Sequence, residues 1–274
     1  MSSRPRTSFA YRRTSRSGSA RVSYRTRIAL SVAFALGAAI APGARSTAAT
    51  KAPTATKTTI PNPCPTKSLT TVAAMNTTKF GAPIRVYKDP DDKADPITTL
   101  GVGIEVNGVP VFTVNSRDGD WLNVNVPRRP NGLTGWIKAS EVHTYQHSYY
   151  IVIQLNARRL TVCNSGRVIQ QESVGVGAPS LGLTPTGYFY TVDLLRPKVG
   201  SAYGAFAFGL SGFSEDPRIE KFAGGDGRIG VHGTRNNSDV GKAISHGCIR
   251  MTNAAITKMA KTIPLGVPVS IQNS

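Results

Sequence analysis

The chain has 274 residues, a length that predicts about two domains, and 40% of them are hydrophobic, which is enough to build ordinary cores. Its formal net charge is +18, from 33 Lys and Arg residues against 15 Asp and Glu residues. Such a charge suits nucleic acid, a membrane surface or anionic cell-wall polymers. No basic motif interleaved with aromatic residues occurs, so we expect no nucleic-acid partner.

The first 48 residues are typical of a signal peptide or an N-terminal anchor. Nine arginines and no acidic residue lie in residues 1–50, and half of the charge excess therefore belongs to this segment. A basic stretch at 4–27 precedes an apolar run of fourteen residues at 28–41, and small residues at 46–48 suit cleavage. A permanent span needs about 20 apolar residues, so cleavage is favoured over anchoring. We expect an exported protein, in the cell wall or a periplasm-equivalent space, that meets the membrane only through this segment.

Residues 49–79 are predicted to form a tether. Thr, Ala, Pro and Lys dominate its first part, including 51–57, and large apolar residues are too few there to form a core. The prolines favour an extended spacer.

Residues 80–145 are predicted to form a small β domain. Residues 104–114 and 121–126 alternate in the strand period, and the turn Asn131-Gly132 leads into Gly135-Trp136-Ile137-Lys138. This order resembles bacterial SH3-like domains, in which a late Gly-Trp strand recurs. The resemblance implies a small β-barrel that positions the protein on its substrate. For Trp121 and Trp136 we favour packing roles over a glycan- or peptide-binding surface.

The remaining residues, from 148 to 273, are predicted to be rich in strands. A short helix over 254–262 is expected, capped by Thr252 or Asn253, before a last strand at 267–272. Residues 200–213 are either a mobile flap or a plain surface loop. His143 and His147 lie at the junction of the two domains and are expected to be exposed linker residues. The earlier strands are predicted at 149–155, 160–163, 167–176 and 188–194.

One cysteine and two histidines lie in a short, glycine-bearing stretch near the C-terminus. A thiol reacts as its thiolate, and an ordinary cysteine with a pKa of about 8.5 is little ionised at neutral pH, so it needs a base. His232 and His246 both flank Cys248. Gly233 and Gly247 carry no side chains, which lets backbone carbonyls orient an imidazole and backbone N–H groups approach an oxyanion.

The segment His232-Gly233-Thr234, followed by Ser245-His246-Gly247-Cys248-Ile249-Arg250, resembles the signature of the YkuD-type L,D-transpeptidase catalytic domain. The segment Thr184-Pro185-Thr186-Gly187-Tyr188-Phe189 is also similar to that family. The sequence departs from many relatives at Arg250, where they have Asn, and at Ala255, where an acidic residue is common.

The two resemblances together imply a fold class, and the resemblance to L,D-transpeptidases implies an activity. The fold class is mainly β, with an SH3-like small β-barrel followed by a β-rich L,D-transpeptidase catalytic domain with a short helix. The enzyme would cross-link third-position residues of peptidoglycan stem peptides through a cysteine thioester, in cell-wall biogenesis and cell shape. The partners implied are the stem peptides, with anionic cell-wall polymers as a further candidate, and no cofactor or metal is needed.

The resemblance also implies roles for individual residues. Cys248 is the nucleophile, and His232 is the base, oriented by a backbone carbonyl near Gly233. His246 shapes the site. In addition, Ser245 fixes the loop, Gly247 contributes to the oxyanion site, and Arg250 holds a substrate carboxylate.

Cysteine counting adds one expectation. Three cysteines less one nucleophile leave Cys64 and Cys163, a pair that could join the tether to the catalytic domain in an oxidising compartment. The alternative is two unpaired thiols.

Other interpretations of the site stay open at this point. Cys248 could be an inert buried residue, or it could bind zinc together with His232 and His246, although no CxxC or HExxH spacing accompanies them. The protein could also be an L,D-carboxypeptidase or another secreted cysteine hydrolase, or a non-catalytic wall-binding protein.

Overall fold

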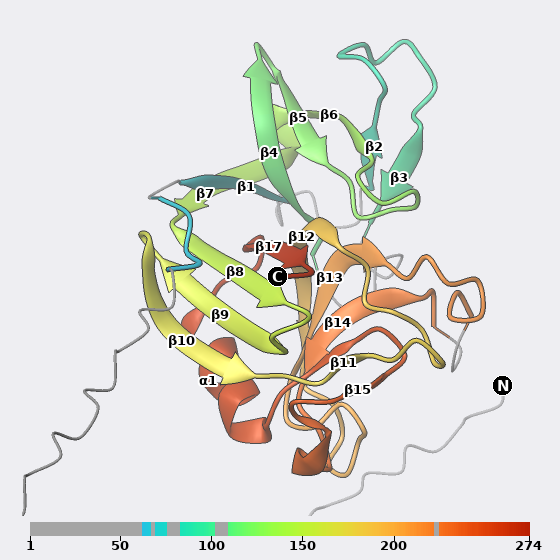
Figure 1. Ribbon diagram of the computed structural model, residues 1–274. Helices are drawn as coiled ribbons and strands as arrows, with labels where there is room; N and C mark the ends of the chain where they lie inside the picture. The colour runs from blue at the N-terminus through green and yellow to red at the C-terminus, as the bar shows by residue number, and fades with distance from the viewer. Residues whose placement is uncertain (1–61, 67–68, 76–82, 102–108, 222–224) are drawn as a thin grey trace, which may run out of the picture. The chain divides into compact units, whose positions relative to one another are not determined.

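The computed structural model describes residues 62–66, 69–75, 83–101, 109–221 and 225–274 (Figure 1). These residues form two main sheets with a single α-helix among them, so the described chain is mainly β, as the sequence predicts. No helix in these ranges is long and apolar enough to cross a membrane. The predicted signal or anchor, residues 1–48, and the predicted tether as far as residue 61 lie outside the described residues.

The first sheet has five strands in the order β6-β5-β4-β1-β7. Side chains of β5 alternate between buried and half-buried positions, with Leu122 and Val124 facing the core. A short pair, β2 (Ile84–Val86) with β3 (Thr98–Leu100), joins β6 through a bridge between Tyr87 and Trp136. The five strands are β1 (Thr70–Met75), β4 (Val111–Asp118), β5 (Trp121–Asn125), β6 (Thr134–Lys138) and β7 (Val142–His147), with the 3₁₀ turn η2 (Ala139–Glu141) before β7. The SH3-like class of this domain stays a prediction.

The two tryptophans of this sheet are half-buried, as their predicted packing roles require. The ring of Trp121 meets Tyr87 edge-on, with 5.5 Å between ring centroids. Lys138 Nζ lies 4.1 Å from the centre of the Trp121 ring. Trp121 thus packs against Tyr87 and Lys138 of its own domain.

Two expectations about this region are wrong. Residues 70–75 of the predicted tether are strand β1, which pairs with both β4 and β7, because Val72 and Ala73 are fully buried and supply core area that the tether composition lacks. His147 is buried rather than exposed, and its Nε2 lies 3.3 Å from the carbonyl oxygen of Gly266. His143 is exposed, as expected.

The second sheet has eight strands in the order β10-β9-β8-β17-β12-β13-β14-β16. Strands β17 and β8 pair in parallel, as do β14 and β16, while the other neighbours are antiparallel. A parallel pair, β11 (Val176–Gly177) with β15 (Ala243–Ser245), lies outside this sheet. The eight strands are β8 (Tyr149–Gln154), β9 (Arg159–Asn164), β10 (Arg167–Ser173), β12 (Gly187–Leu195), β13 (Ala207–Phe213), β14 (Arg228–His232), β16 (Ile249–Arg250) and β17 (Pro268–Gln272).

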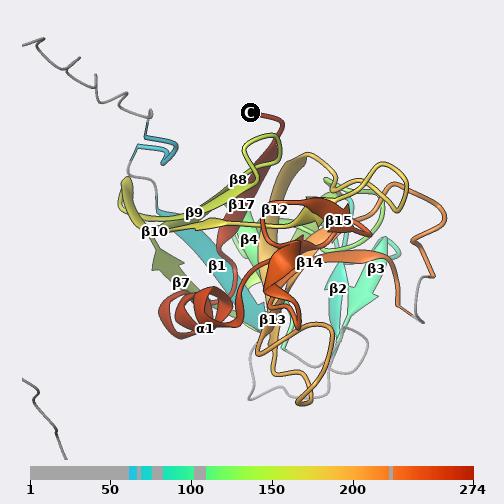
Figure 2. The same cartoon turned by 60° about the horizontal axis from the view of Figure 1, so that its bottom comes forward.

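Helix α1 (Asn253–Thr262) lies against this curved sheet (Figure 2). Thr252 is its N-cap, and the Thr252 hydroxyl accepts a hydrogen bond from the Ala255 amide at 3.2 Å. Ala255, Ile256 and Met259 are buried on one face of the helix and join the core of the eight-stranded sheet. The predicted helix and its cap are therefore confirmed.

Half of the predicted flap is a strand. Residues 207–213 form β13, and Phe208 and Leu210 are fully buried between β12 and β14. Glycines normally weaken strands, which is why the sequence favours a loop here. In this strand the glycines are needed for space, because a Cβ on Gly212 would collide with the ring of Phe189.

Specific hydrogen bonds connect residues of the two domains. The Asn131 side chain donates to the carbonyl of Phe213 and accepts from its amide, each at 2.9 Å. The buried Tyr190 hydroxyl donates to the carbonyl of Asn125 at 2.8 Å. Tyr190 also packs in a small apolar cluster with Val72 and Val111.

Cys64 and Cys163 form a disulfide, which confirms the pairing expected from the cysteine count. Cys163 is buried in β9, and the neighbouring Asn62 donates to the carbonyl of Gly166 at 3.0 Å. The bridge therefore connects the segment before β1 to strand β9 of the second sheet.

The disulfide closes a sequence separation of 99 residues, so its loss should reduce stability. Cross-links of that span restrict the unfolded chain, and removal of a native disulfide costs about 2–5 kcal/mol. We expect the double variant Cys64→Ala/Cys163→Ala to unfold at clearly lower urea concentration than the oxidised protein. Reduced wild-type protein is the control and should match the variant. An unchanged midpoint in the variant would contradict a stabilising role.

Candidate active site

Strand pairing brings the predicted nucleophile and base together. Strands β14 and β16 are parallel, with Val231 opposite Ile249 and His232 opposite Arg250. This register places Cys248, which immediately precedes β16, level with Gly230. The Met251 amide donates to the carbonyl of His232 at 2.8 Å and extends the pairing by one residue.

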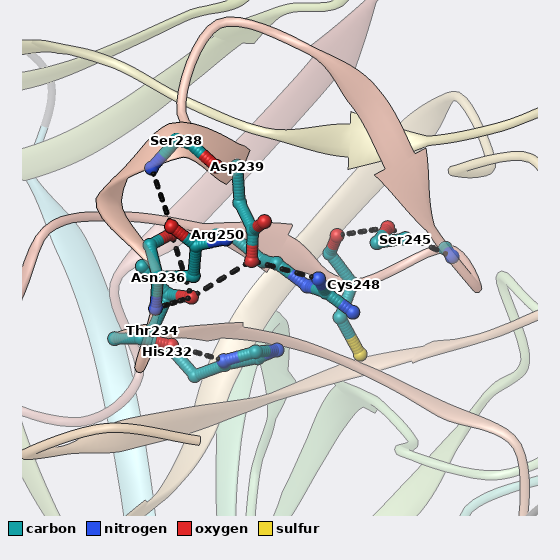
Figure 3. Close-up of polar contacts among 10 residues, drawn as sticks. His232, Thr234, Asn236, Ser238, Asp239, Ser245, Cys248 and Arg250 are labelled. Carbon is teal, nitrogen blue, oxygen red and sulfur yellow. Dashed lines mark hydrogen bonds and ion pairs between the residues drawn. The ribbon is translucent and has the colours of Figure 1, made fainter. Parts of the chain in front are cut away.

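The His232 ring is oriented by a backbone carbonyl. Its Nδ1 lies 2.6 Å from the carbonyl oxygen of Gly233. A carbonyl can only accept, so Nδ1 carries the proton and Nε2 is left as the basic nitrogen. Figure 3 shows this second nitrogen directed toward the sulfur of Cys248.

Burial keeps the His232 ring neutral. Burial lowers the pKa of His232 to about 4, although the hydrogen bond to the Gly233 carbonyl raises it. The charge of Arg250 lowers this pKa further, and that of Asp239 raises it. At neutral pH the ring is therefore neutral, and its Nε2 is the unprotonated, basic nitrogen.

Cys248 is the free cysteine of the described chain, and the residue is half-buried. Burial raises the pKa of its thiol, while the Gly230 backbone and the charge of Arg250 lower it. The resting pair is thus a neutral thiol beside a neutral imidazole. Such a pair can transfer a proton when the sulfur attacks, with His232 as general base.

The loop before Cys248 is held by two hydroxyl groups. Ser245 Oγ donates to the carbonyl of Cys248 at 2.5 Å and accepts from the amide of Gly247 at 3.1 Å. Thr184 Oγ1 donates to the carbonyl of Gly247 at 2.8 Å. Gly247 has a φ of 111°, which side chains rarely adopt, and a Cβ there would lie 3.2 Å from the carbonyl oxygen of Leu183. Because its amide already donates to Ser245, Gly247 shapes this loop through its backbone.

His246 is half-buried between Ser245 and Gly247. Among the described residues, no three His, Cys, Asp or Glu side chains gather as ligands of one metal ion. In the described part of the chain, His232, His246 and Cys248 are thus not found as a group of three ligands.

The structure adds a buried carboxylate to the site. Asp239 Oδ2 lies 2.9 Å from Arg250 Nη1 and accepts from the Thr234 hydroxyl at 2.9 Å (Figure 3). No motif in the sequence points to Asp239, although it is the only acidic residue between His232 and Cys248. Arg250, predicted to bind a substrate carboxylate, is thus already paired within the protein.

Two further residues of the site were not predicted. The Tyr203 ring meets the His232 ring edge-on, with 4.9 Å between centroids, and half of its surface is exposed. Asn253 Oδ1 accepts from the Ala205 amide at 2.9 Å, and its Nδ2 donates to the carbonyl of Thr234 at 3.0 Å. Asn253 therefore ties the loop that carries Tyr203 to the segment after His232.

The raised pKa of the Cys248 thiol predicts how its rate of alkylation depends on pH. Alkylation by iodoacetamide requires the thiolate, so with a raised thiol pKa its rate should climb only at alkaline pH, above the ordinary value of about 8.5. The rate at pH 7 should be a small fraction of the alkaline limit. The measurement is the second-order rate constant between pH 5 and pH 10.5. Fast alkylation that is independent of pH from 5 to 8 would instead reveal a preformed thiolate and imidazolium.

Comparisons with known proteins agree with this geometry. The sequence profile of the YkuD family, described as the L,D-transpeptidase catalytic domain, matches residues 148–271. The chain is 34% identical to YkuD of Bacillus subtilis (strain 168) over 127 residues, which are 46% of this chain and 68% of that protein. It is 34% identical to YqjB of the same organism over 131 residues, which are 44% of this chain and 70% of that protein.

Solved structures are more distant. A mutant L,D-transpeptidase of Enterococcus faecium aligns with 18% identity and a TM-score of 0.35, over 45% of this chain and 49% of that chain. The chain thus spans about half the length of that structure. By its family profile and its relatives in Bacillus subtilis, the chain belongs to the YkuD family of L,D-transpeptidases.

Proposed function

We propose that the protein is an exported peptidoglycan L,D-transpeptidase that links third-position residues of two stem peptides through a thioester on Cys248. The observation that carries this proposal is the orientation of His232. The Gly233 carbonyl fixes the proton on Nδ1, and the basic Nε2 is directed toward the Cys248 sulfur. Membership of the family supports the choice of peptidoglycan stem peptides as substrate.

The first half-reaction forms the thioester. His232 Nε2 takes the proton of the Cys248 thiol as the sulfur attacks the carbonyl carbon of the third residue in a stem tetrapeptide. A C–S bond forms, and the carbonyl oxygen becomes an oxyanion. When this intermediate collapses, the C–N bond breaks, His232 returns the proton to the leaving amine, and D-alanine departs.

The second half-reaction resolves the thioester. The side-chain amine of a second stem attacks the thioester carbonyl and gives a proton to His232. A new C–N bond forms, the C–S bond breaks, and Cys248 recovers its proton. Water would give a tripeptide monomer at this step, so the site must bind the amine acceptor and limit hydrolysis.

The oxyanion of each step needs N–H donors. The Gly247 amide donates to Ser245 Oγ, so we assign the main donor role to the amide of Cys248, with Gly247 keeping the loop in the required conformation. A donor of this kind contributes roughly 3–4 kcal/mol to acyl transfer. Any contact of Arg250 with a substrate carboxylate would use the nitrogen atoms that are not bonded to Asp239.

The disulfide and the N-terminal sequence support export. Structural disulfides persist in oxidising compartments outside the cytosol. The basic and apolar segments of residues 1–48 have the order of a signal peptide or an anchor. The positive charge of the chain is compatible with the anionic polymers of a cell wall.

A product analysis tests the proposed reaction. Incubation of the protein with a disaccharide tetrapeptide should give a dimer linked between two third-position residues, with release of an equal amount of D-alanine. The Cys248→Ala variant should yield neither product, because no other group is proposed to form the covalent bond. If mass spectrometry finds only tripeptide monomer at high acceptor concentration, the protein is an L,D-carboxypeptidase. Activity of the pure Cys248→Ala variant would remove Cys248 from the mechanism.

The two histidines should differ in their effect on the first step. Loss of a general base slows a reaction by about 100- to 10,000-fold, so His232→Ala should reduce the single-turnover rate of acylation by a carbapenem to this extent. His246→Ala should have a smaller effect. Circular dichroism provides the control for folding of both variants. If His246→Ala proves the slower variant, the two histidine roles are exchanged.

A further inference from the structure

Asp239 occupies a buried position behind the catalytic pair. It ends the 3₁₀ turn η4 (Asn237–Asp239), and 7% of its surface is exposed. Its Oδ2 accepts from the Thr234 hydroxyl and from Arg250 Nη1, each at 2.9 Å (Figure 3). Charge-assisted hydrogen bonds of this length are among the stronger ones in proteins.

The backbone of this turn is fixed by its own hydrogen bonds. The Asn236 side chain accepts from the Ser238 amide at 3.1 Å, and the Asp239 amide donates to the Asn236 carbonyl at 3.1 Å. The Thr234 hydroxyl accepts from the Asn236 amide at 3.1 Å. These hydrogen bonds therefore fix the position of the Asp239 carboxylate independently of Arg250.

Arg250 is held less firmly by its surroundings than Asp239. Its backbone exchanges two hydrogen bonds of 2.8 Å with Gly175, which fixes the Cα. The side chain is 26% exposed, against 10% for Asp239, and a long flexible guanidinium gains hydration and rotamer freedom when it turns outward. The ion pair with Asp239 opposes that movement.

We propose that Asp239 is a positioning residue, which holds the Arg250 guanidinium beside Cys248 so that a positive charge faces the sulfur when His232 takes its proton. Arg250 acts on both partners of the reaction, because its charge lowers the pKa of the Cys248 thiol and that of the His232 ring. The proposal relies on the proposed function only for the role of Cys248 as the nucleophile.

The charge of Arg250 acts on the Cys248 thiol in this arrangement, and Figure 3 shows the two side chains beside each other. Tyr203, from the loop before β13, interacts electrostatically with Cys248, and burial raises the pKa of its hydroxyl, so it is neutral near pH 7. His232, from β14, is also neutral at that pH. His246 lies two residues before Cys248 in the chain.

The test is the rate of Cys248 alkylation by iodoacetamide between pH 7 and pH 10.5, which needs no peptidoglycan substrate. Without Asp239 the guanidinium should turn to solvent. We expect Asp239→Ala to slow alkylation at pH 7 by about tenfold, which corresponds to a rise of one pKa unit. The rates of the variant and the wild type should converge at high pH, because both are then thiolates. A merely structural change in access to the sulfur would lower the rate equally at every pH.

Further variants separate position from charge. Arg250→Met should slow alkylation as Asp239→Ala does, and the double variant should be no slower than Arg250→Met alone. Asp239→Asn should stay within about twofold of the wild type, because its amide oxygen can still accept from Arg250. If Asp239→Ala fails to fold, an Asp239→Asn variant that is alkylated much more slowly than the wild type would still contradict the proposal. Asp226→Asn is the matched control, since Asp226 pairs with Arg228 outside this network, and its profile should be that of the wild type.

Three results would overturn the proposal. One is an Asp239→Ala profile that coincides with the wild type. Another is a double variant slower than Arg250→Met, which would show that Asp239 acts independently of Arg250. The third is an Asp239→Asn variant as slow as Asp239→Ala, which would show that the hydrogen bond does not hold the guanidinium. Failure of turnover on a stem peptide with all alkylation results as expected would count against the proposed function and leave the role of Asp239 intact.

Discussion

The parallel pairing of β14 with β16 is the constraint on which the site depends. The two strands share only two paired positions, yet Val231 and Ile249 at the first of them are fully buried in the core of the eight-stranded sheet. Burial of one such side chain contributes about 1.5–3 kcal/mol. The apolar core thus fixes the register, and the register places Cys248 level with Gly230, two residues before His232 on the neighbouring strand. A slip of one residue would turn the alternate side chains to opposite faces of the sheet and separate the pair.

Burial of Cys248 and His232 has two opposite effects on the proposed reaction. It favours the neutral forms of both the thiol and the imidazole, so no thiolate is stored in the resting site. The same burial strengthens every charge that remains nearby, including that of Arg250. In the mechanism that we propose, the proton transfer is therefore coupled to the attack on substrate, and the orientation of the His232 ring matters as much as its basicity. The Gly233 carbonyl provides that orientation.

The sequence predicts those parts of the site that are encoded locally. Cys248, His232 and Gly233 lie in short motifs whose glycines carry their own conformational meaning, and Thr252 is a cap that depends only on the next three residues. Cys64 and Cys163 are the pair that remains once Cys248 is assigned as the nucleophile, and the structure decides between a bridge and two unpaired thiols. Other features depend on the fold. Asp239, Tyr203 and Asn253 reach the site through contacts that no spacing in the sequence indicates.

The errors in the fold have a similar origin. Strand β13 contains glycines that argue against a strand, and the close approach of Phe189 to Gly212 and of Asp193 to Gly209 explains them. The Thr-, Ala-, Pro- and Lys-rich composition predicts a tether where β1 forms, and the position of His147 at the domain junction predicts an exposed linker residue. In the fold they are covered by strands that are distant in the chain.

The protonation of His232 at neutral pH tests the central claim most directly. Nitrogen-15 NMR of the histidine rings distinguishes a neutral ring with its proton on Nδ1, a neutral ring with its proton on Nε2, and an imidazolium. The His232→Ala variant assigns the signal. Because Nδ1 donates to the Gly233 carbonyl and burial lowers the pKa of the ring to about 4, the spectrum at pH 7 should show the Nδ1-protonated neutral form. An imidazolium at pH 7, or a proton on Nε2, would contradict the assignment of His232 as a preoriented neutral base.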